Sequence, residues 1–221
     1  MQMKVIIFGA TGMVGQSALR ESLLNDEVKE VVTIGRKRTN AMHEKLTEIE
    51  LANVADLSSI EEKITGFDAC FFCLGVSSQG MKEDEYTKVT YDLTLSAAKT
   101  LAKLNPDMTF IYVSGSGTDS TESGRTMWAR VKGRTENELL RLPFKSAYMF
   151  RPGLIIPTNG VKSKTKSYQL MYDIMKPFNP LLKRLGSVIT SEQLGRTMIR
   201  VGKDGYTHSI IESSDLKKIS M

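Results

Sequence analysis

The chain has 221 residues, 41% hydrophobic and 25% charged, as expected for a soluble protein with one sizeable core. No apolar run is long enough to span a membrane, and the apolar N-terminal stretch ends too early in glycines for a signal peptide, so we expect a cytoplasmic protein without a membrane anchor. The net charge of +5 has its basic excess after residue 150, which favours an anionic ligand or simply a solvated surface. No interleaved aromatic residues or recognised motif suggest nucleic-acid binding.

Alternating apolar runs and amphipathic segments predict strands and helices in turn over residues 1–153. A β-branched run predicts a first strand at 4–10, and apolar positions at helical spacing predict a helix at 11–25. Further strands are expected at 30–36, 49–57, 68–75, 108–117 and 146–155, and further helices at 58–65, 83–106 and 127–142. This alternation implies crossover connections and an α/β fold, with a doubly wound parallel sheet covered by helices on both faces.

The pattern loosens after residue 153. It predicts an interrupted helix, a capped helix, and a last strand with a short turn, at 166–185, 190–202 and 206–219. This part is too short for a core of its own. We therefore expect a single domain over 1–221, with a Rossmann core at 1–153 and a small extension at 154–221 that forms one wall of a ligand pocket.

A glycine-rich loop, GATGMVG, follows the first strand and opens a helix. Gly9 permits a tight turn, Gly12 lets the backbone approach a pyrophosphate, and Gly15 lets the helix lie near the sheet. The pyrophosphate would face free N–H groups at the positive end of the helix. The loop therefore predicts a dinucleotide site; the alternative is a glycine-rich turn without a ligand.

The second strand ends in basic residues, Arg36, Lys37 and Arg38, where an NAD site usually has a carboxylate for the ribose 2′-hydroxyl. A guanidinium can hold a 2′-phosphate through two hydrogen bonds, so we expect NADP(H) to be preferred over NAD(H). A solvated basic turn is the alternative. Asp56, after the third strand, either accepts from the adenine amino group or caps the next helix, and the spacing leaves both open.

Cys70 and Cys73 form a C-x-x-C motif inside a predicted strand. Residues three apart in a strand point to opposite faces, so we expect two buried thiols rather than a redox or metal pair. His43 and His208 are isolated, and no convincing group of ligands suggests a metal site. We therefore predict no metal.

Several motifs occur in a familiar order: GATGMVG, a basic residue after the second strand, ADL, CLG, YVSGSG, a lysine on the next helix, and FRPG. Over essentially its whole length the chain resembles the atypical or extended short-chain dehydrogenase/reductases. The stretch 131–155 is similar to the Tat-interacting-protein-like branch of that family. The resemblance implies a Rossmann fold that binds NADP(H).

The resemblance also implies which residues contact each part of the cofactor. They are Gly9, Thr11, Gly12, Met13, Val14 and Gly15 at the phosphate loop, Arg36 and Lys37 at the 2′-phosphate, Asp56 and Leu57 at adenine, Leu74 and Gly75 at the adenine ribose, Lys132 at the nicotinamide ribose, and Pro152, Gly153 and Leu154 at the nicotinamide.

The catalytic positions that the resemblance implies are Ser116, Trp128 and Lys132, with Ser114 as the less favoured serine. The family uses a tyrosine where this chain has Trp128, and that tyrosine protonates a carbonyl oxygen as hydride arrives. Indole has a single N–H donor and cannot exchange a proton near neutral pH. Trp128 and Lys132 are four residues apart, so they share one helix face. The alternatives are ordinary turn serines and a tryptophan packed in an interface.

Two functions remain open. One is an NADP(H)-dependent oxidoreductase acting on a small carbonyl or sugar-like substrate, with a substitute proton donor such as Tyr86, Tyr91, Tyr168 or Tyr172. The other is a non-catalytic NADP(H)-binding protein that reports redox state to a protein partner. The missing tyrosine favours the second function, and the intact loop, serine and lysine favour the first. A homodimer is expected from general frequency alone.

Overall fold

A seven-stranded sheet runs through the centre of the molecule, and all of its neighbouring strands are parallel. The computed structural model describes residues 2–161, 182, 185 and 187–220. In spatial order the strands are β3 (Leu46–Glu50), β2 (Val28–Gly35), β1 (Met3–Phe8), β4 (Ala69–Phe72), β5 (Thr109–Val113), β6 (Ser146–Arg151) and β9 (Ile210–Glu212). The strand order reverses between β1 and β4, where open α/β sheets bind ligands. The predicted doubly wound parallel sheet is confirmed.

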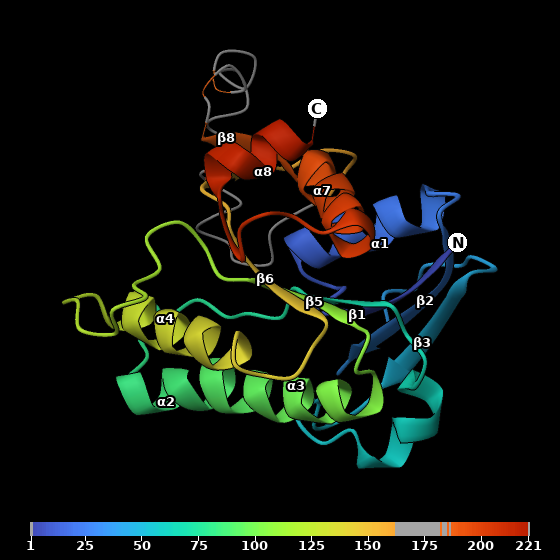
Figure 1. Ribbon diagram of the computed structural model, residues 1–221, viewed down its shortest axis with the longest axis horizontal. Coiled ribbons are helices and arrows are strands. Elements are labelled where there is room, and N and C mark those ends of the chain that lie inside the picture. The colour runs from blue at the N-terminus through green and yellow to red at the C-terminus, as the bar shows by residue number, and fades with distance from the viewer. Residues whose placement is uncertain (1, 162–181, 183–184, 186, 221) are drawn as a thin grey trace.

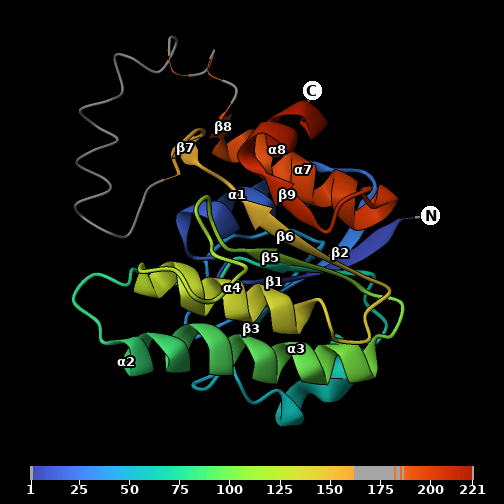
Figure 2. The same cartoon turned by 60° about the vertical axis from the view of Figure 1, so that its left-hand side comes forward.

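Helices cover both faces of the sheet (Figure 1, Figure 2). One face carries α1 (Met13–Leu24), α7 (Ser191–Asp204) and α8 (Ser213–Ile219). The other carries η1 (Ser58–Ile64), α2 (Glu83–Thr87), α3 (Leu93–Leu104) and α4 (Met127–Leu139). Each face has its own cluster of buried apolar side chains. The central strands are apolar on both sides because both of their faces are covered.

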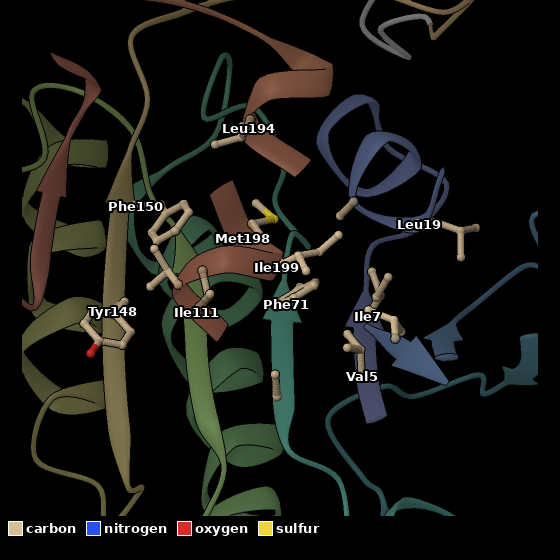
Figure 3. Packing of buried hydrophobic residues seen from close by; sticks show 14 of the residues in the cluster. Val5, Ile7, Leu19, Phe71, Ile111, Tyr148, Phe150, Leu194, Met198 and Ile199 are labelled. Carbon is tan, nitrogen blue, oxygen red and sulfur yellow. The ribbon is translucent and has the colours of Figure 1, made fainter. Parts of the chain in front are cut away.

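The residues after 153 contribute more to the core than the pocket wall that we expected. Figure 3 shows Met198 and Ile199 of α7 lying over side chains of the central strands. α7 also lies along α1, and β9 adds the last strand of the sheet beside β6. The final segment is therefore part of the Rossmann layers themselves.

The third strand is shorter and earlier than the predicted 49–57, because β3 ends at Glu50. The side chains of Asn53 and Asp56 accept hydrogen bonds from the backbone two residues ahead, at Ala55 and Ser58 (3.1 and 3.0 Å). Such turns compete with a strand ladder for the backbone donors. Their polar side chains therefore end the strand where apolar content alone suggested that it continues.

The sixth predicted strand, 146–155, is divided by Pro152, which has no N–H to donate to a ladder. β6 ends at Arg151, and β7 (Leu154–Ile156) pairs with β8 (Val188–Thr190) in a separate two-stranded sheet. The long helix predicted at 83–106 contains a π turn, η2 (Lys88–Asp92), between α2 and α3. This turn lies against α4.

Helix α7 begins with the cap that the sequence indicated. The Thr190 hydroxyl accepts from the Gln193 N–H (3.1 Å), and the Gln193 side chain accepts from the Thr190 N–H (3.0 Å). The turn predicted after the last strand is instead the helix α8. The interrupted helix expected at 166–185 lies outside the described residues, apart from Leu182 and Leu185.

Candidate functional site

Two cavities lie at the carboxyl ends of the central strands. The β2 cavity, about 450 Å³, is lined by Gly9, Ala10, Thr11, Thr33, Ile34, Gly35, Arg36, Lys37, Thr39 and Leu74. The α4 cavity, about 400 Å³, is lined by Val76, Ser77, Ser78, Tyr86, Ser114, Gly115, Ser116, Trp128, Lys132, Pro152 and Gly153. The phosphate loop lines the β2 cavity through Gly9, Ala10 and Thr11, and the loop after β4 lines the α4 cavity through Val76, Ser77 and Ser78.

The phosphate loop is built so tightly that two of its glycines cannot carry a side chain. Gly9 has a φ of +75°, and a Cβ there would lie 2.7 Å from the backbone N of Leu74. A Cβ at Gly15 would lie 2.1 Å from the carbonyl O of Gly9. Gly9 thus turns the chain beside the end of β4, and Gly15 brings α1 against that turn.

Gly12 serves a different purpose, because a Cβ there would meet only the carbonyl O of Gly9, at 3.4 Å. Gly12 is the N-cap of α1, and no side chain of the described residues caps this helix or places a carboxylate in its first turn. The N–H groups of Met13, Val14 and Gly15 form the start of the helix, whose positive end carries no compensating charge. The open space at Gly12 fits a close backbone approach by an anionic group.

Basic side chains surround the end of β2. Arg36 and Lys37 line the β2 cavity, whereas Arg38 lines a neighbouring cavity on the outer side of α1. None of the described residues that line the β2 cavity is acidic. Thr39, which the sequence did not single out, also lines it and is held by the Glu48 carboxylate through its N–H and hydroxyl (2.6 and 2.8 Å). The sequence signal that could have identified Thr39 is its position directly after the run of basic residues.

The residues expected near the adenine and its ribose do not gather in one cavity. Leu74 lines the β2 cavity, but Gly75, Asp56 and Leu57 line neither cavity. Asp56 accepts from both the N–H and the hydroxyl of Ser58 (3.0 and 2.7 Å), and these bonds hold the pKa of its carboxyl below the usual value. Leu57 is buried in the core. Asp56 thus forms a turn just before η1, whose N-cap is Leu57 without a side-chain cap, and its contact with adenine stays a prediction.

Trp128 and Lys132 both line the α4 cavity, as their spacing on one helix face suggested. The edge of the indole lies over Gly117, where a Cβ would be 3.6 Å from Trp128 Cη2. The loop that contains Gly117 is tied to the end of β6, because the Ser116 N–H donates to the Pro152 carbonyl (2.9 Å). Helix α4, the loop after β5 and the end of β6 therefore enclose one space.

The two candidate serines have different surroundings. Ser114 is buried, and its hydroxyl lies against the Glu136 carboxylate and the Phe150 carbonyl. Ser116 is exposed and lines the α4 cavity. Only an accessible hydroxyl can orient a substrate, so this geometry favours Ser116 over Ser114.

The Lys132 ammonium donates to the Ser114 carbonyl. Burial disfavours its charged form and lowers its pKa to about 8, and the nearby Glu136 carboxylate opposes this shift. Lys132 is therefore mainly charged near neutral pH but close to its titration range. A charged ammonium at this place can hold hydroxyl groups of a bound ligand.

Lys132 should leave a signature in the pH dependence of stability. Its pKa is about 8 when folded against an ordinary 10.5, so between these values the unfolded chain binds more protons and stability rises with pH. We expect the unfolding free energy of the wild type to gain on the order of 1–2 kcal/mol over Lys132→Met across this window. Denaturant melts of both proteins at several pH values measure the difference. A difference that is constant with pH would contradict the assignment.

The tyrosines suggested by the sequence as substitute proton donors differ in whether they line the α4 cavity. Among the described residues, Tyr86 is the tyrosine that lines the α4 cavity. Tyr91 lines neither cavity, and the Arg134 guanidinium lies over its ring at 4.3 Å. Tyr168 and Tyr172 lie outside the described residues.

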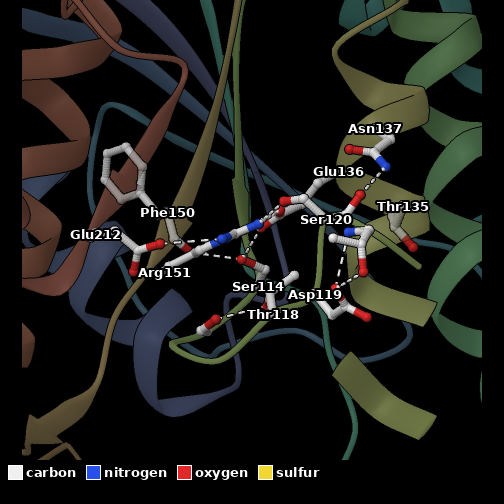
Figure 4. A network of polar contacts seen from close by, with 12 residues as sticks. Ser114, Thr118, Asp119, Ser120, Thr135, Glu136, Asn137, Phe150, Arg151 and Glu212 are labelled. Atoms are coloured by element: carbon white, nitrogen blue, oxygen red, sulfur yellow. Dashed lines mark hydrogen bonds and ion pairs between the residues drawn. The ribbon is translucent and has the colours of Figure 1, made fainter. Parts of the chain in front are cut away.

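A buried ion pair beside the α4 cavity was missed by sequence reasoning (Figure 4). Arg151 lies between Glu212 and Glu136, and Glu136 is fully buried. Pro152 and Gly153, which follow Arg151, line the α4 cavity, whereas Leu154 begins β7 and does not. Glu136 lies one helical turn after Lys132, so helical spacing could have singled out Glu136, although it could not have revealed the contact with Arg151.

The two thiols point to opposite faces of the sheet, as predicted. Cys70 belongs to one core cluster, and Cys73 packs against the other, 4.0 Å from the sulfur of Met198. Burial raises the pKa of both thiols, to about 12 for Cys73, so neither is a reactive thiolate. Within the described ranges, no three metal-ligating side chains gather, and no helix is long and apolar enough to cross a membrane.

The fold and the loop together define a class of protein. A doubly wound parallel sheet with a glycine-rich loop at its switch point is the dinucleotide-binding Rossmann arrangement. Residues 5–136 match the family described as NAD dependent epimerase/dehydratase, and the chain belongs to that family.

Relatives and solved structures agree with this class. The chain is 25% identical over 224 residues to protein fmp52-2, mitochondrial, of Aspergillus oryzae, covering 96% of this chain and 95% of the relative. It is 31% identical over 155 residues to protein HTATIP2 of Rattus norvegicus, covering 69% and 62%. WbmF of Bordetella bronchiseptica, solved with NAD+, has a TM-score of 0.69 at 13% identity, covering 98% of this chain and 77% of WbmF.

The resemblance to the atypical short-chain dehydrogenase/reductases, including their Tat-interacting-protein-like branch, is thereby confirmed. The predicted cytoplasmic location is corrected. Three relatives that match over more than nine-tenths of this chain are named mitochondrial proteins, at 25%, 27% and 28% identity. Composition and the pattern of the first residues were too weak a basis for a location.

Proposed function

We propose that the protein binds NADP(H) across the two cavities and acts as an oxidoreductase on a small carbonyl or sugar-like substrate. The observation that carries this proposal is the pairing of a basic cavity at the end of β2 with a cavity that contains Ser116, Trp128 and Lys132. The open backbone at Gly12 and the uncapped start of α1 fit the pyrophosphate between them. When bound, the cofactor would supply or accept a hydride.

The chain's own residues would bind and orient the reactants. Arg36 and Lys37 neutralise the 2′-phosphate, and the Lys132 ammonium donates to the nicotinamide ribose hydroxyls. Pro152 and Gly153 border the nicotinamide and exclude water from one side. The Ser116 hydroxyl donates to the substrate oxygen and orients it. Trp128 fills the place of the family's proton donor, so the proton comes from another group or from water.

A second function is favoured by Trp128 itself. A site with a large indole in place of the phenol binds the cofactor but lacks the usual acid. In this alternative the protein is a non-catalytic NADP(H)-binding regulator that reports redox state to a protein partner. A homodimer is compatible with either function.

The cofactor preference is tested at the end of β2. We expect Arg36→Ala to weaken NADPH binding by about tenfold or more and NADH binding much less, because only NADPH has the 2′-phosphate. Arg38→Ala is the matched control, since Arg38 lines the neighbouring cavity. Trp128 is the sole tryptophan of the chain, so its fluorescence can report each titration.

Two results would count against the proposal. Equal losses of NADPH and NADH affinity in Arg36→Ala would remove the NADP preference. Tryptophan emission that is unchanged by saturating NADPH would contradict a cofactor bound beside Trp128.

A further inference from the structure

The buried pair of Arg151 and Glu136 joins the segments that line the α4 cavity. The Arg151 Nε lies 3.1 and 3.2 Å from the two carboxylate oxygens of Glu136, and Nη2 contacts the same carboxylate. The Arg151 Nη1 donates to the Glu212 carboxylate (3.2 Å), and Nη2 also donates to the Ser120 hydroxyl. One guanidinium therefore connects β6, helix α4, the loop after β5, and β9.

The pair continues directly to Lys132. The Glu136 carboxylate accepts from the Ser114 hydroxyl, and the Ser114 carbonyl accepts from the Lys132 ammonium. Ser114 is itself fixed to β6, because its N–H donates to the Phe150 carbonyl (2.9 Å). The position of the ammonium thus depends on a chain of contacts that begins at Arg151.

The charges around Lys132 are few. Helix α4 itself contributes the Glu136 carboxylate and the uncharged Trp128 side chain to this region. Strand β6 contributes the Arg151 guanidinium, which is paired with Glu136. Strand β5 and helix α2 contribute the phenols of Tyr112 and Tyr86. Burial raises the pKa of Tyr112 far above neutral, so that phenol stays uncharged. Glu136 is therefore the negative charge that favours the ammonium form of Lys132.

A buried ion pair is a weak stabiliser, because desolvation offsets most of its Coulomb attraction. We propose that Glu136 and Arg151 are positioning residues that keep the Lys132 ammonium charged and in place for the nicotinamide ribose. The inference rests on the proposed NADP(H) function. Arg151 orients the carboxylate, and the carboxylate acts on Lys132 through its charge and through Ser114.

The test compares NADPH affinity across pH for the wild type, Glu136→Gln and Lys132→Met. Wild-type affinity should be nearly constant between the second pKa of the 2′-phosphate, about 6, and neutral pH, and fall above about pH 8 as Lys132 loses its proton. In Glu136→Gln the fall should begin at lower pH, giving about five- to tenfold weaker binding near the wild-type midpoint if the pKa falls by about one unit. At acidic pH the two proteins should bind alike, and Lys132→Met should lack the pH-dependent fall.

A merely structural role gives a different pattern. Loss of affinity by the same factor at every pH, an unchanged midpoint in Glu136→Gln, or a pH-dependent fall that persists in Lys132→Met would overturn the inference. Should Glu136→Gln fail to fold, Glu136→Gln/Arg151→Gln removes both charges together. Its midpoint should still lie below that of the wild type, and an equal midpoint overturns the inference. A wild type that binds no NADPH at any pH overturns the proposed function and the inference with it.

Discussion

Trp128→Tyr should raise the rate of carbonyl reduction with NADPH by about 10²–10⁴-fold, the usual contribution of a general acid. Trp128 lines the same cavity as Lys132 and Ser116, so a phenol there would lie near a cation and a candidate substrate-orienting hydroxyl. The Lys132 ammonium, with its pKa of about 8, is charged at neutral pH and would lower the pKa of that phenol. Initial rates on a panel of small aldehydes and ketones measure the effect.

Trp128→Phe is the matched control for this experiment. It removes the same indole bulk from the surface of Gly117 but supplies no proton. A gain in the tyrosine variant alone would identify a reductase site that lacks its acid. Equal gains in both variants would mean that the indole only obstructs the substrate. No gain in either, with NADPH binding retained, would favour the non-catalytic regulator.

Gly15→Ala should cost about 1–3 kcal/mol of stability, because its Cβ would lie 2.1 Å from the Gly9 carbonyl O and α1 must move away. For a chain of this size the melting temperature falls by about 2–4 °C per kcal/mol. The movement also displaces the start of α1, so NADPH affinity should fall together with stability. Thermal unfolding and fluorescence titration of the same samples measure both effects.

Gly12→Ala separates binding from folding. Its Cβ would meet only one backbone atom, at 3.4 Å, so the stability loss should stay near the roughly 0.5–1 kcal/mol expected for a poorer N-cap. The methyl group would nevertheless occupy the open space beside the helix start and weaken NADPH binding by about tenfold or more. Wild-type affinity in Gly12→Ala would show that the pyrophosphate does not approach this glycine.

The layers of the fold could be predicted because local patterns report directly on burial. Strands such as Met3–Phe8 are apolar at nearly every position because helices cover both faces of the sheet. The errors arise where a single polar residue or proline outweighs that pattern. Asn53 and Asp56 end β3 through side-chain bonds to the backbone, and Pro152 separates β6 from β7.

The candidate site was predictable where chemistry follows local spacing. The glycines of the phosphate loop and the pair Trp128 and Lys132 are close in sequence, and the structure places each group as its spacing suggested. The contact between Glu136 and Arg151 joins a helix to a strand 15 residues later, and no local period reports it. The preference for Ser116 over Ser114 came from the resemblance, and the burial of Ser114 in the folded chain agrees with it.

The packing of α7 on α1 has a consequence for how the chain folds. A Cβ at Gly195 would lie 2.8 Å from the Ser17 carbonyl, and Arg196 bonds Glu21 across 175 residues of sequence. Contacts between such distant segments are slow to form, because a long loop must close before they contribute. The helix that begins at the phosphate loop thus gains its packing partner only after α7 (Ser191–Asp204) has been synthesised. We therefore expect the nucleotide cradle to form late in folding, after both segments are available to pack on each other.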